Sequence, residues 1–136
     1  MARDYAERAS ASGRALGLAP VDIIEVEARK PGKAAEAAVL TPHLQDAYVI
    51  ACDEHGQQMA SRAFADRIAR LRDDGTRKLV LVIGGADGLD AELLASADAR
   101  LAFGPQTWPH ALVRAMLAEQ VYRAVTILAG SPYHRD

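Results

Sequence analysis

Apolar residues form several short, nearly uninterrupted runs, which is the pattern expected of parallel strands covered on both faces. The runs cover residues 47–53, 79–83 and 101–103. A further run, Val21–Val26, is predicted to be a strand because it is rich in β-branched side chains. Each of these runs is short enough for a strand and is bounded by polar residues, glycine or proline.

Between the strand-like runs, apolar residues recur at spacings of three and four, which predicts helices that pack by one face. The expected helices cover residues 2–17, about 34–40, 61 to about 72, 91–97 and 109 to about 128. Gly17 is a suitable stop for the first helix, and Ser61 and Asp90 are suitable N-caps for later ones. Strands that alternate with helices predict an α/β fold with a parallel sheet, here in one domain spanning residues 1–136.

The bulk composition is that of an ordinary globular protein: half of the residues are apolar and a quarter are charged. A net charge of −2 argues against a free-standing nucleic-acid binder, because such proteins are usually basic. The single cysteine, Cys52, excludes an internal disulfide, and no apolar run approaches the length of a membrane span. These features predict a cytoplasmic protein without a membrane partner.

Unusual residues follow three of the predicted strands. The segments are Asp53–Gly56, Gly84–Leu89 and Gly104–Trp108. In open parallel sheets, ligands bind beyond the carboxyl ends of the strands, and these ends share one edge of the sheet. We therefore expect the three segments to form a cup of backbone N–H and C=O groups, with Trp108 as an apolar wall.

Each part of this cup also has a simple structural explanation. The pair Gly84 and Gly85 fits a tight turn, and Cys52 fits a small core hydrophobe. The pair has neither the spacing of a dinucleotide fingerprint nor the lysine of a phosphate loop, so a small nucleotide-binding α/β protein is the weakest hypothesis. His43 and His55 are expected to be loop histidines, because no second histidine or cysteine stands at metal-ligand spacing. We therefore expect no metal.

The C-terminal quarter adds two further features. Glu119 and Arg123 are four residues apart on the last predicted helix, as in an exposed ion pair worth about 0.3–0.5 kcal/mol. The tail, Pro132–Arg135, brings together an aromatic ring, an imidazole and a guanidinium. A disordered end needs no particular composition, but a ring beside a cation is also what recognition of single-stranded RNA uses.

The C-terminal half carries a family resemblance. It rests on four stretches, residues 81–89, 103–110, 112–123 and 132–135. In these stretches the sequence resembles the RlmH family, ribosomal large-subunit pseudouridine N3-methyltransferases of the SPOUT superfamily. The resemblance implies a homodimer and a parallel-sheet α/β-knot whose C-terminus forms a trefoil knot. Members usually open with a β-strand, whereas this chain begins inside the first helix, so that strand is expected to be missing.

The resemblance also implies the chemistry. The methyl donor is S-adenosylmethionine, and the acceptor is N3 of a pseudouridine in 23S rRNA of the assembled ribosome. The family positions for the donor fall here on Cys52, Gly84, Phe103, Gly104, Pro105, Gln106, Thr107 and Trp108. His110, Tyr133 and His134 are candidates for removing the N3 proton, and Arg123 for stabilising negative charge on the base. A structural role at a helix end explains His110 equally well.

A basic segment near the N-terminus supplies a possible contact with RNA. Arg29, Lys30 and Lys33 are expected to touch rRNA phosphates. The alternative function is a non-catalytic ribosome-binding dimer that has lost activity with its N-terminal strand. Binding of S-adenosylmethionine separates the two hypotheses, since only the enzyme should saturate.

Overall fold

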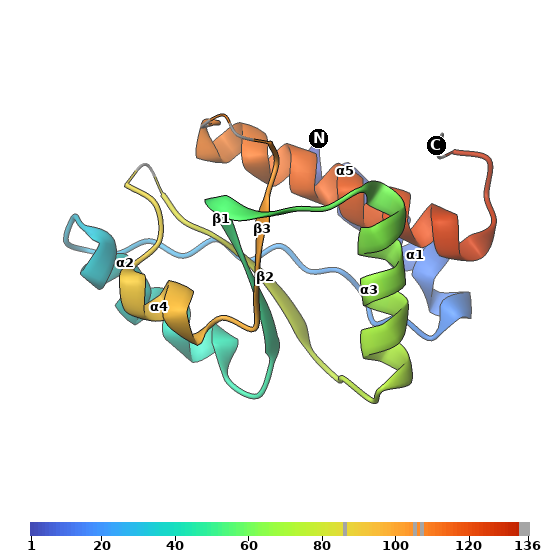
Figure 1. Ribbon diagram of the computed structural model, residues 1–136, viewed down its shortest axis with the longest axis horizontal. Coiled ribbons are helices and arrows are strands. Elements are labelled where there is room, and N and C mark those ends of the chain that lie inside the picture. Colours follow the sequence, from blue (N-terminus) through green and yellow to red (C-terminus); the bar gives the residue numbers. More distant parts are fainter. Residues whose placement is uncertain (86, 105, 107, 134–136) are drawn as a thin grey trace. The chain divides into compact units, whose positions relative to one another are not determined.

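The computed structural model describes residues 1–85, 87–104, 106 and 108–133 (Figure 1). The elements in chain order are α1 (Ala2–Gly13), η1 (Arg14–Leu16), α2 (Lys33–Leu40), η2 (Thr41–Leu44), β1 (Tyr48–Gln58), α3 (Ser61–Asp73), β2 (Leu79–Ile83), α4 (Ala91–Ser96), β3 (Ala99–Ala102) and α5 (His110–Ala129). They fall into two compact units. The first comprises Met1–Ile24, Met59–Gly75 and Ala111–Asp136, and the second Glu25–Gln58 and Thr76–His110. The single domain and the knot stay predictions.

The second unit is built on a parallel sheet, as the apolar runs predict. Among the described residues the sheet has three strands in the order β2-β1-β3, and β1 pairs in parallel with both neighbours. Cys52 of β1 is in register with Ile83 of β2 and with Leu101 of β3. The carboxyl ends of β1's first paired segment and of both neighbours therefore meet at one edge of the sheet.

Helices α2 and α4 cover one face of this sheet (Figure 1). Alternate residues of a strand point to the same face, so Val49, Ala51 and Val82 share a buried cluster with residues of both helices. The cluster comprises Val49, Ala51, Val82, Leu89 and Leu93, with Ala37, Leu40, Leu44, Ala47, Val80, Leu94 and Ala97 packed against it. Asp90 caps α4 as predicted, since its carboxylate accepts hydrogen bonds from the N–H groups of Glu92 and Leu93.

The segment Asp53–Gly56 does not end its strand, contrary to the prediction. Strand β1 continues to Gln58, and its pairing with β3 slips between Cys52 and Gln57, so the intervening residues form a bulge. The Asp53 carboxylate accepts the N–H of His55 at 3.2 Å. A side chain at Gly56 would lie 2.8 Å from the backbone of Arg100 and Leu101, so only glycine allows the bulge to approach β3 this closely. His55 therefore lies in a strand.

The predicted strand at Val21–Val26 is wrong. These residues are irregular, and the N–H of Val21 donates to Ser10 Oγ at 2.8 Å instead of to a neighbouring strand. Ile24 is 65% exposed. β-Branched side chains favour a strand only where a partner completes the ladder, and no described strand pairs with this segment.

The first unit contains helices α1 and α3 and all of α5 except His110 (Figure 1). The side chains that they bury lie at spacings of three and four, as predicted, and include Ala6, Ala9, Phe64, Ile68, Leu117, Val121, Ala124 and Val125. Gly17 adopts the left-handed conformation expected after a helix. The predicted cap is wrong: Ala60 is the N-cap of α3, and Ser61 Oγ donates instead to Gln120 Oε1 of α5 at 2.6 Å.

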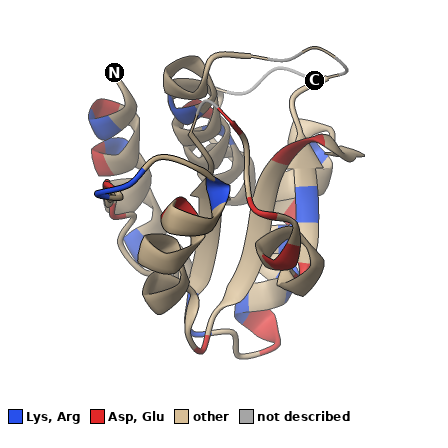
Figure 2. Cartoon of the chain, turned by 90° about the vertical axis from the view of Figure 1, so that its left-hand side faces the viewer, with Lys and Arg blue, Asp and Glu red and all other residues tan. Residues whose placement is uncertain are grey.

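Charged residues of both signs are interspersed on the helices and loops, whereas the strands are largely uncharged (Figure 2). This distribution accords with the predominantly apolar strand sequences. Within the described ranges, no helix combines the length and the apolar character that crossing a membrane would need.

Candidate functional site

The predicted donor-binding residues gather at the carboxyl edge of the sheet in the second unit. Cys52 lies in the central strand, Gly84 directly follows β2, and Phe103 directly follows β3. Gly104, Gln106 and Trp108 belong to the segment that continues from Phe103. Pro105 and Thr107, also predicted here, lie outside the described residues. The strand register thus brings the three chain segments to one edge.

Gly84 is required by the backbone of its own loop. A Cβ at this position would lie 2.7 Å from the carbonyl carbon of Gly88 and 2.9 Å from its oxygen. The loop is closed by the N–H of Gly88, which donates to the carbonyl of Gly85 at 3.0 Å, and Gly88 has a positive φ of 81°. The loop shape therefore depends on glycine whether or not a ligand approaches it.

Glu36 of α2 holds the same loop from outside, a contact that the sequence analysis missed. Its Oε1 accepts the N–H of Gly85 at 2.9 Å. The ideal Cβ of Gly85 would lie 2.9 Å from this carboxylate, so the missing side chain admits the contact. Acidic residues are common in the first turn of a helix, where they interact favourably with the helix dipole. The sequence therefore gives no sign that Glu36 accepts a hydrogen bond from a distant loop.

The segment after β3 is folded back by its tryptophan. Trp108 Nε1 donates to the carbonyl of Phe103 at 3.0 Å, and the Trp108 residue remains 38% exposed. Gly104 has a φ of 100°, and no atom lies within 4 Å of its ideal Cβ position. The segment thus presents an exposed indole and open backbone, which a ligand could contact at the sheet edge.

Cys52 is half-buried at the end of β1's first paired segment. Burial raises the pKa of its thiol to about 12. The thiol is therefore protonated at neutral pH and is neither a nucleophile nor a metal ligand under those conditions. The described residues contain no group of three or more His, Cys, Asp or Glu side chains that could hold a metal ion.

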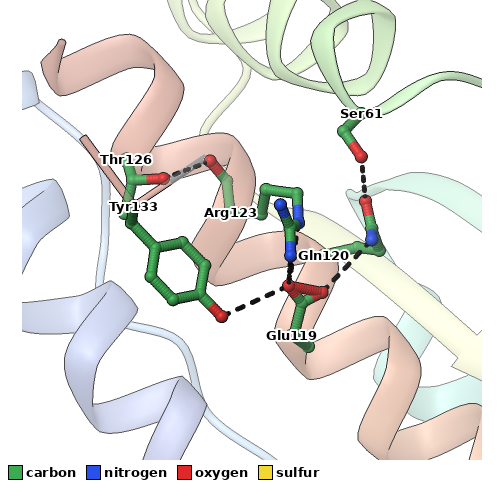
Figure 3. Close-up of polar contacts among 6 residues, drawn as sticks. All are labelled: Ser61, Glu119, Gln120, Arg123, Thr126 and Tyr133. Atoms are coloured by element: carbon green, nitrogen blue, oxygen red, sulfur yellow. Dashed lines mark hydrogen bonds and ion pairs between the residues drawn. The ribbon is translucent and has the colours of Figure 1, made fainter. Parts of the chain in front are cut away.

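A second group of candidate residues lies on α5 in the first unit. Glu119 Oε1 accepts a hydrogen bond from Arg123 Nε at 2.8 Å and forms an ion pair with Arg123 Nη2 at 2.6 Å. Tyr133 Oη donates to the same oxygen at 3.4 Å (Figure 3). The two side chains of the ion pair are 26% and 18% exposed. The ion pair expected from the helical spacing is therefore present, and its side chains are partly shielded from solvent.

Aromatic contacts place Tyr133 against α5. Its ring meets that of Tyr122 edge-on with centroids 4.7 Å apart, and the Arg123 guanidinium lies 5.2 Å from the Tyr133 centroid. Burial raises the pKa of the Tyr133 hydroxyl, and a hydrogen bond with Tyr5 raises it further. The hydrogen bond with Glu119 raises the pKa of Arg123. Tyr133 is thus a proton donor at neutral pH, which disfavours it as the base.

The remaining candidates for proton removal are two histidines, one at the start of α5 and one in the C-terminal tail. His110 is the first residue of α5 and is exposed. His134 lies outside the described residues. The structure therefore groups Arg123 with Tyr133, and it places His110 at the end of the segment that carries Trp108.

Comparison with known proteins identifies the family. A family model described as "Predicted SPOUT methyltransferase" matches residues 1–134. The chain is 75% identical over its full length to ribosomal RNA large subunit methyltransferase H of a Caulobacter species, covering 88% of that protein. Identity is 74%, with the same coverage, to the protein of that name from Caulobacter vibrioides. It is 56% to the one from Ruegeria pomeroyi, covering 97% of this chain and 86% of that protein. The chain belongs to the SPOUT methyltransferase family.

Proposed function

We propose that this SPOUT methyltransferase transfers a methyl group from S-adenosylmethionine to N3 of a pseudouridine in 23S rRNA of the assembled ribosome. The names of its relatives support an rRNA substrate and favour the enzyme over a non-catalytic ribosome-binding dimer. The observation that carries the proposal is the meeting of Cys52, Gly84 and Phe103 at one edge of a parallel sheet.

The residues at this edge suit the proposed donor. Open backbone at Gly104 and the exposed ring of Trp108 provide polar and apolar contacts for an adenosine linked to an amino acid. The proposed binding set is Cys52, Gly84, Phe103, Gly104, Pro105, Gln106, Thr107 and Trp108. When bound, S-adenosylmethionine supplies a methyl group on an electrophilic sulfonium. The protonated thiol of Cys52 does not compete for that methyl group, because the thiolate is the nucleophilic form.

The proposed acceptor chemistry requires one proton to leave. N3 of pseudouridine is protonated at neutral pH, so it must lose that proton as its bond to the methyl carbon forms and the bond from that carbon to the donor sulfur breaks. We assign proton removal to the imidazole of His110 or of His134. Arg123 stabilises negative charge on the base. Tyr133, whose raised pKa keeps its hydroxyl protonated, contacts the base through its aromatic ring.

The proposal includes a homodimer in which the tail of one subunit completes the site of the other. The ribosome places the enzyme in the cytoplasm. Arg29, Lys30 and Lys33 are exposed and are proposed to contact rRNA phosphates. A net charge of −2 gives weak attraction to free RNA, so the ribosomal particle is the expected substrate.

Transfer of a labelled methyl group tests the proposal. The acceptors are ribosomal particles that lack the modification and protein-free 23S rRNA, and the modified nucleoside is identified by mass spectrometry. We expect methylation at N3 of pseudouridine in the particle and poor transfer to free rRNA. Equal rates on both would contradict the need for the ribosome. Calorimetry with S-adenosylmethionine is the second arm: an absence of both binding and transfer would support the non-catalytic dimer.

A further inference from the structure

Glu119 lies at the centre of the polar contacts between α5 and the tail (Figure 3). We propose that Glu119 is a positioning residue that holds Arg123 and Tyr133 in one arrangement, ready to act on the acceptor base. This inference rests on the proposed function, because it concerns two residues assigned to the acceptor. In this proposal Glu119 itself does not contact the substrate.

The first argument is the number of bonds to one carboxylate. Glu119 Oε1 accepts a hydrogen bond from Arg123 Nε at 2.8 Å, forms an ion pair with Arg123 Nη2 at 2.6 Å, and accepts a longer hydrogen bond from Tyr133 at 3.4 Å. Its Oε2 accepts from Gln120 Nε2 at 3.2 Å. Both oxygens are therefore engaged, and the strongest bonds are charge-assisted. The carboxylate fixes the guanidinium directly and the tail ring at its hydroxyl end.

The second argument is that Glu119 is itself held in place. Gln120 Oε1 accepts from Ser61 Oγ of α3 at 2.6 Å, so a relay runs from α3 through Gln120 to the carboxylate (Figure 3). The Glu119 side chain is only 18% exposed. A partly buried carboxylate with a fixed neighbour has fewer orientations than one on an open helix face. A carboxylate held in this way can place the side chains of Arg123 and Tyr133 precisely.

The third argument concerns what the arrangement leaves for substrate. A guanidinium carries five N–H donors, and only its Nε and Nη2 contact Glu119, which is compatible with a further anionic acceptor. The Tyr133 ring packs on Tyr122 with its centroid 5.2 Å from the Arg123 guanidinium. Arg123 and Tyr133 thus contact each other as well as Glu119, so loss of the Glu119 carboxylate is expected to disturb both side chains.

The test compares Glu119→Gln and Glu119→Ala with the wild-type protein. All three proteins are labelled with fluorotyrosine, and their fluorine NMR spectra are recorded. The fluorine resonance of Tyr133 is assigned with Tyr133→Phe. We expect both substitutions to move this resonance in the free protein. In the methylation assay we expect kcat/KM for the ribosomal particle to fall about tenfold or more in Glu119→Ala and less in Glu119→Gln, which keeps an acceptor oxygen. The dissociation constant for S-adenosylmethionine should stay within about twofold, since Glu119 is not among the proposed donor residues.

Glu7→Gln, an exposed residue of α1, is the matched control and should change neither the resonance nor the kinetics. A purely structural role would lower the melting temperature of the Glu119 variants and leave kcat/KM unchanged. That result, or an unmoved Tyr133 resonance in Glu119→Gln, would overturn the inference. Wild-type protein that fails to methylate the particle would instead overturn the proposed function, so the two failures are distinguishable.

Discussion

Two carboxylates, one in each unit, organise the two candidate regions in different ways. Glu36 accepts a backbone N–H, that of Gly85, and so fixes the shape of the main chain at the sheet edge. Glu119 accepts from the side chains of Arg123 and Tyr133, and so fixes the position of a charge and a ring. The first region is built from backbone and the second from side-chain functional groups.

This difference predicts different responses to substitution. A backbone-built region tolerates many side chains but not a change that alters its turn. A side-chain-built region responds to the loss of a single functional group and to charge. The two regions should also separate in assays, because the first is proposed to bind the donor and the second to act on the acceptor.

The largest expected effect is on the backbone-built region. Gly84→Val places side-chain atoms where Gly88 already lies, 2.7 Å from the new Cβ, so the loop must open. We expect S-adenosylmethionine to bind about 100-fold more weakly or worse, a loss of about 2.8 kcal/mol or more. Calorimetry measures this loss. A thermal melt should show a smaller loss in the free energy of unfolding, about 1–3 kcal/mol, from the steric conflict.

Gly75→Val is the matched control for this substitution. Gly75 has a φ of 87° and no atom within 4 Å of its ideal Cβ, so valine there costs only backbone strain of about 1–2 kcal/mol. Donor affinity should be retained. If Gly84→Val binds the donor as well as this control does, the proposed donor site is wrong.

The second largest effect is expected in the side-chain-built region. Arg123→Ala removes the cation proposed to face the developing anion, and kcat should fall about 100-fold. The single-turnover rate on ribosomal particles measures it, with donor affinity unchanged. Loss of the ion pair also leaves the part-buried Glu119 carboxylate without its cation, at a cost of about 1–3 kcal/mol.

Arg123→Lys separates these two effects, since lysine restores the charge but not the two-pronged geometry. We expect lysine to recover stability more fully than rate. Equal recovery of both would show that Arg123 acts only through folding.

The third effect is intermediate. Glu36→Ala leaves the N–H of Gly85 without its carboxylate, and donor affinity should fall about tenfold, in line with the worth of a hydrogen bond to a charged group. Glu36→Gln keeps an acceptor and should lose less. Glu92→Ala, at an exposed position in the first turn of α4, serves as control. A Glu36→Ala protein with unchanged donor affinity would show that the loop holds its shape alone.

The smallest effect concerns Cys52. With a pKa of about 12, the thiol is almost wholly protonated at pH 8, so iodoacetamide should alkylate it far more slowly in the native protein than in urea. Cys52→Ala should leave turnover within about threefold, because the residue is only an apolar wall. Rapid native alkylation at pH 8 would contradict the protonated state, and loss of turnover would indicate a larger role.

The elements of the backbone-built region were predictable because their signals are local. The run Leu79–Ile83 is a strand with the predicted bounds, and Asp90 caps the next helix as predicted. The Val21–Val26 prediction failed because a strand needs a partner that the local pattern does not reveal. The bulge at Asp53–Gly56 was missed for a similar reason, since it depends on the close approach of β3.

The carboxylate contacts were harder to predict than the elements. Glu36 and Gly85 are 49 residues apart, and no local sequence pattern indicates that they are in contact. The pairing of Glu119 with Arg123 was visible from its helical spacing, but its partial shielding from solvent was not. Spacing along one helix fixes which side chains meet, whereas burial depends on what packs over them.

Trp108 gives this molecule a built-in optical reporter. It is the one tryptophan among 136 residues, and its indole N–H is bonded to the carbonyl of Phe103, within the segment proposed to take the donor. Indole emission responds to solvent polarity and to stacking, so a fluorescence titration would follow events at this segment without an added dye. The four tyrosines would not obscure the signal when excitation is set above their absorption band.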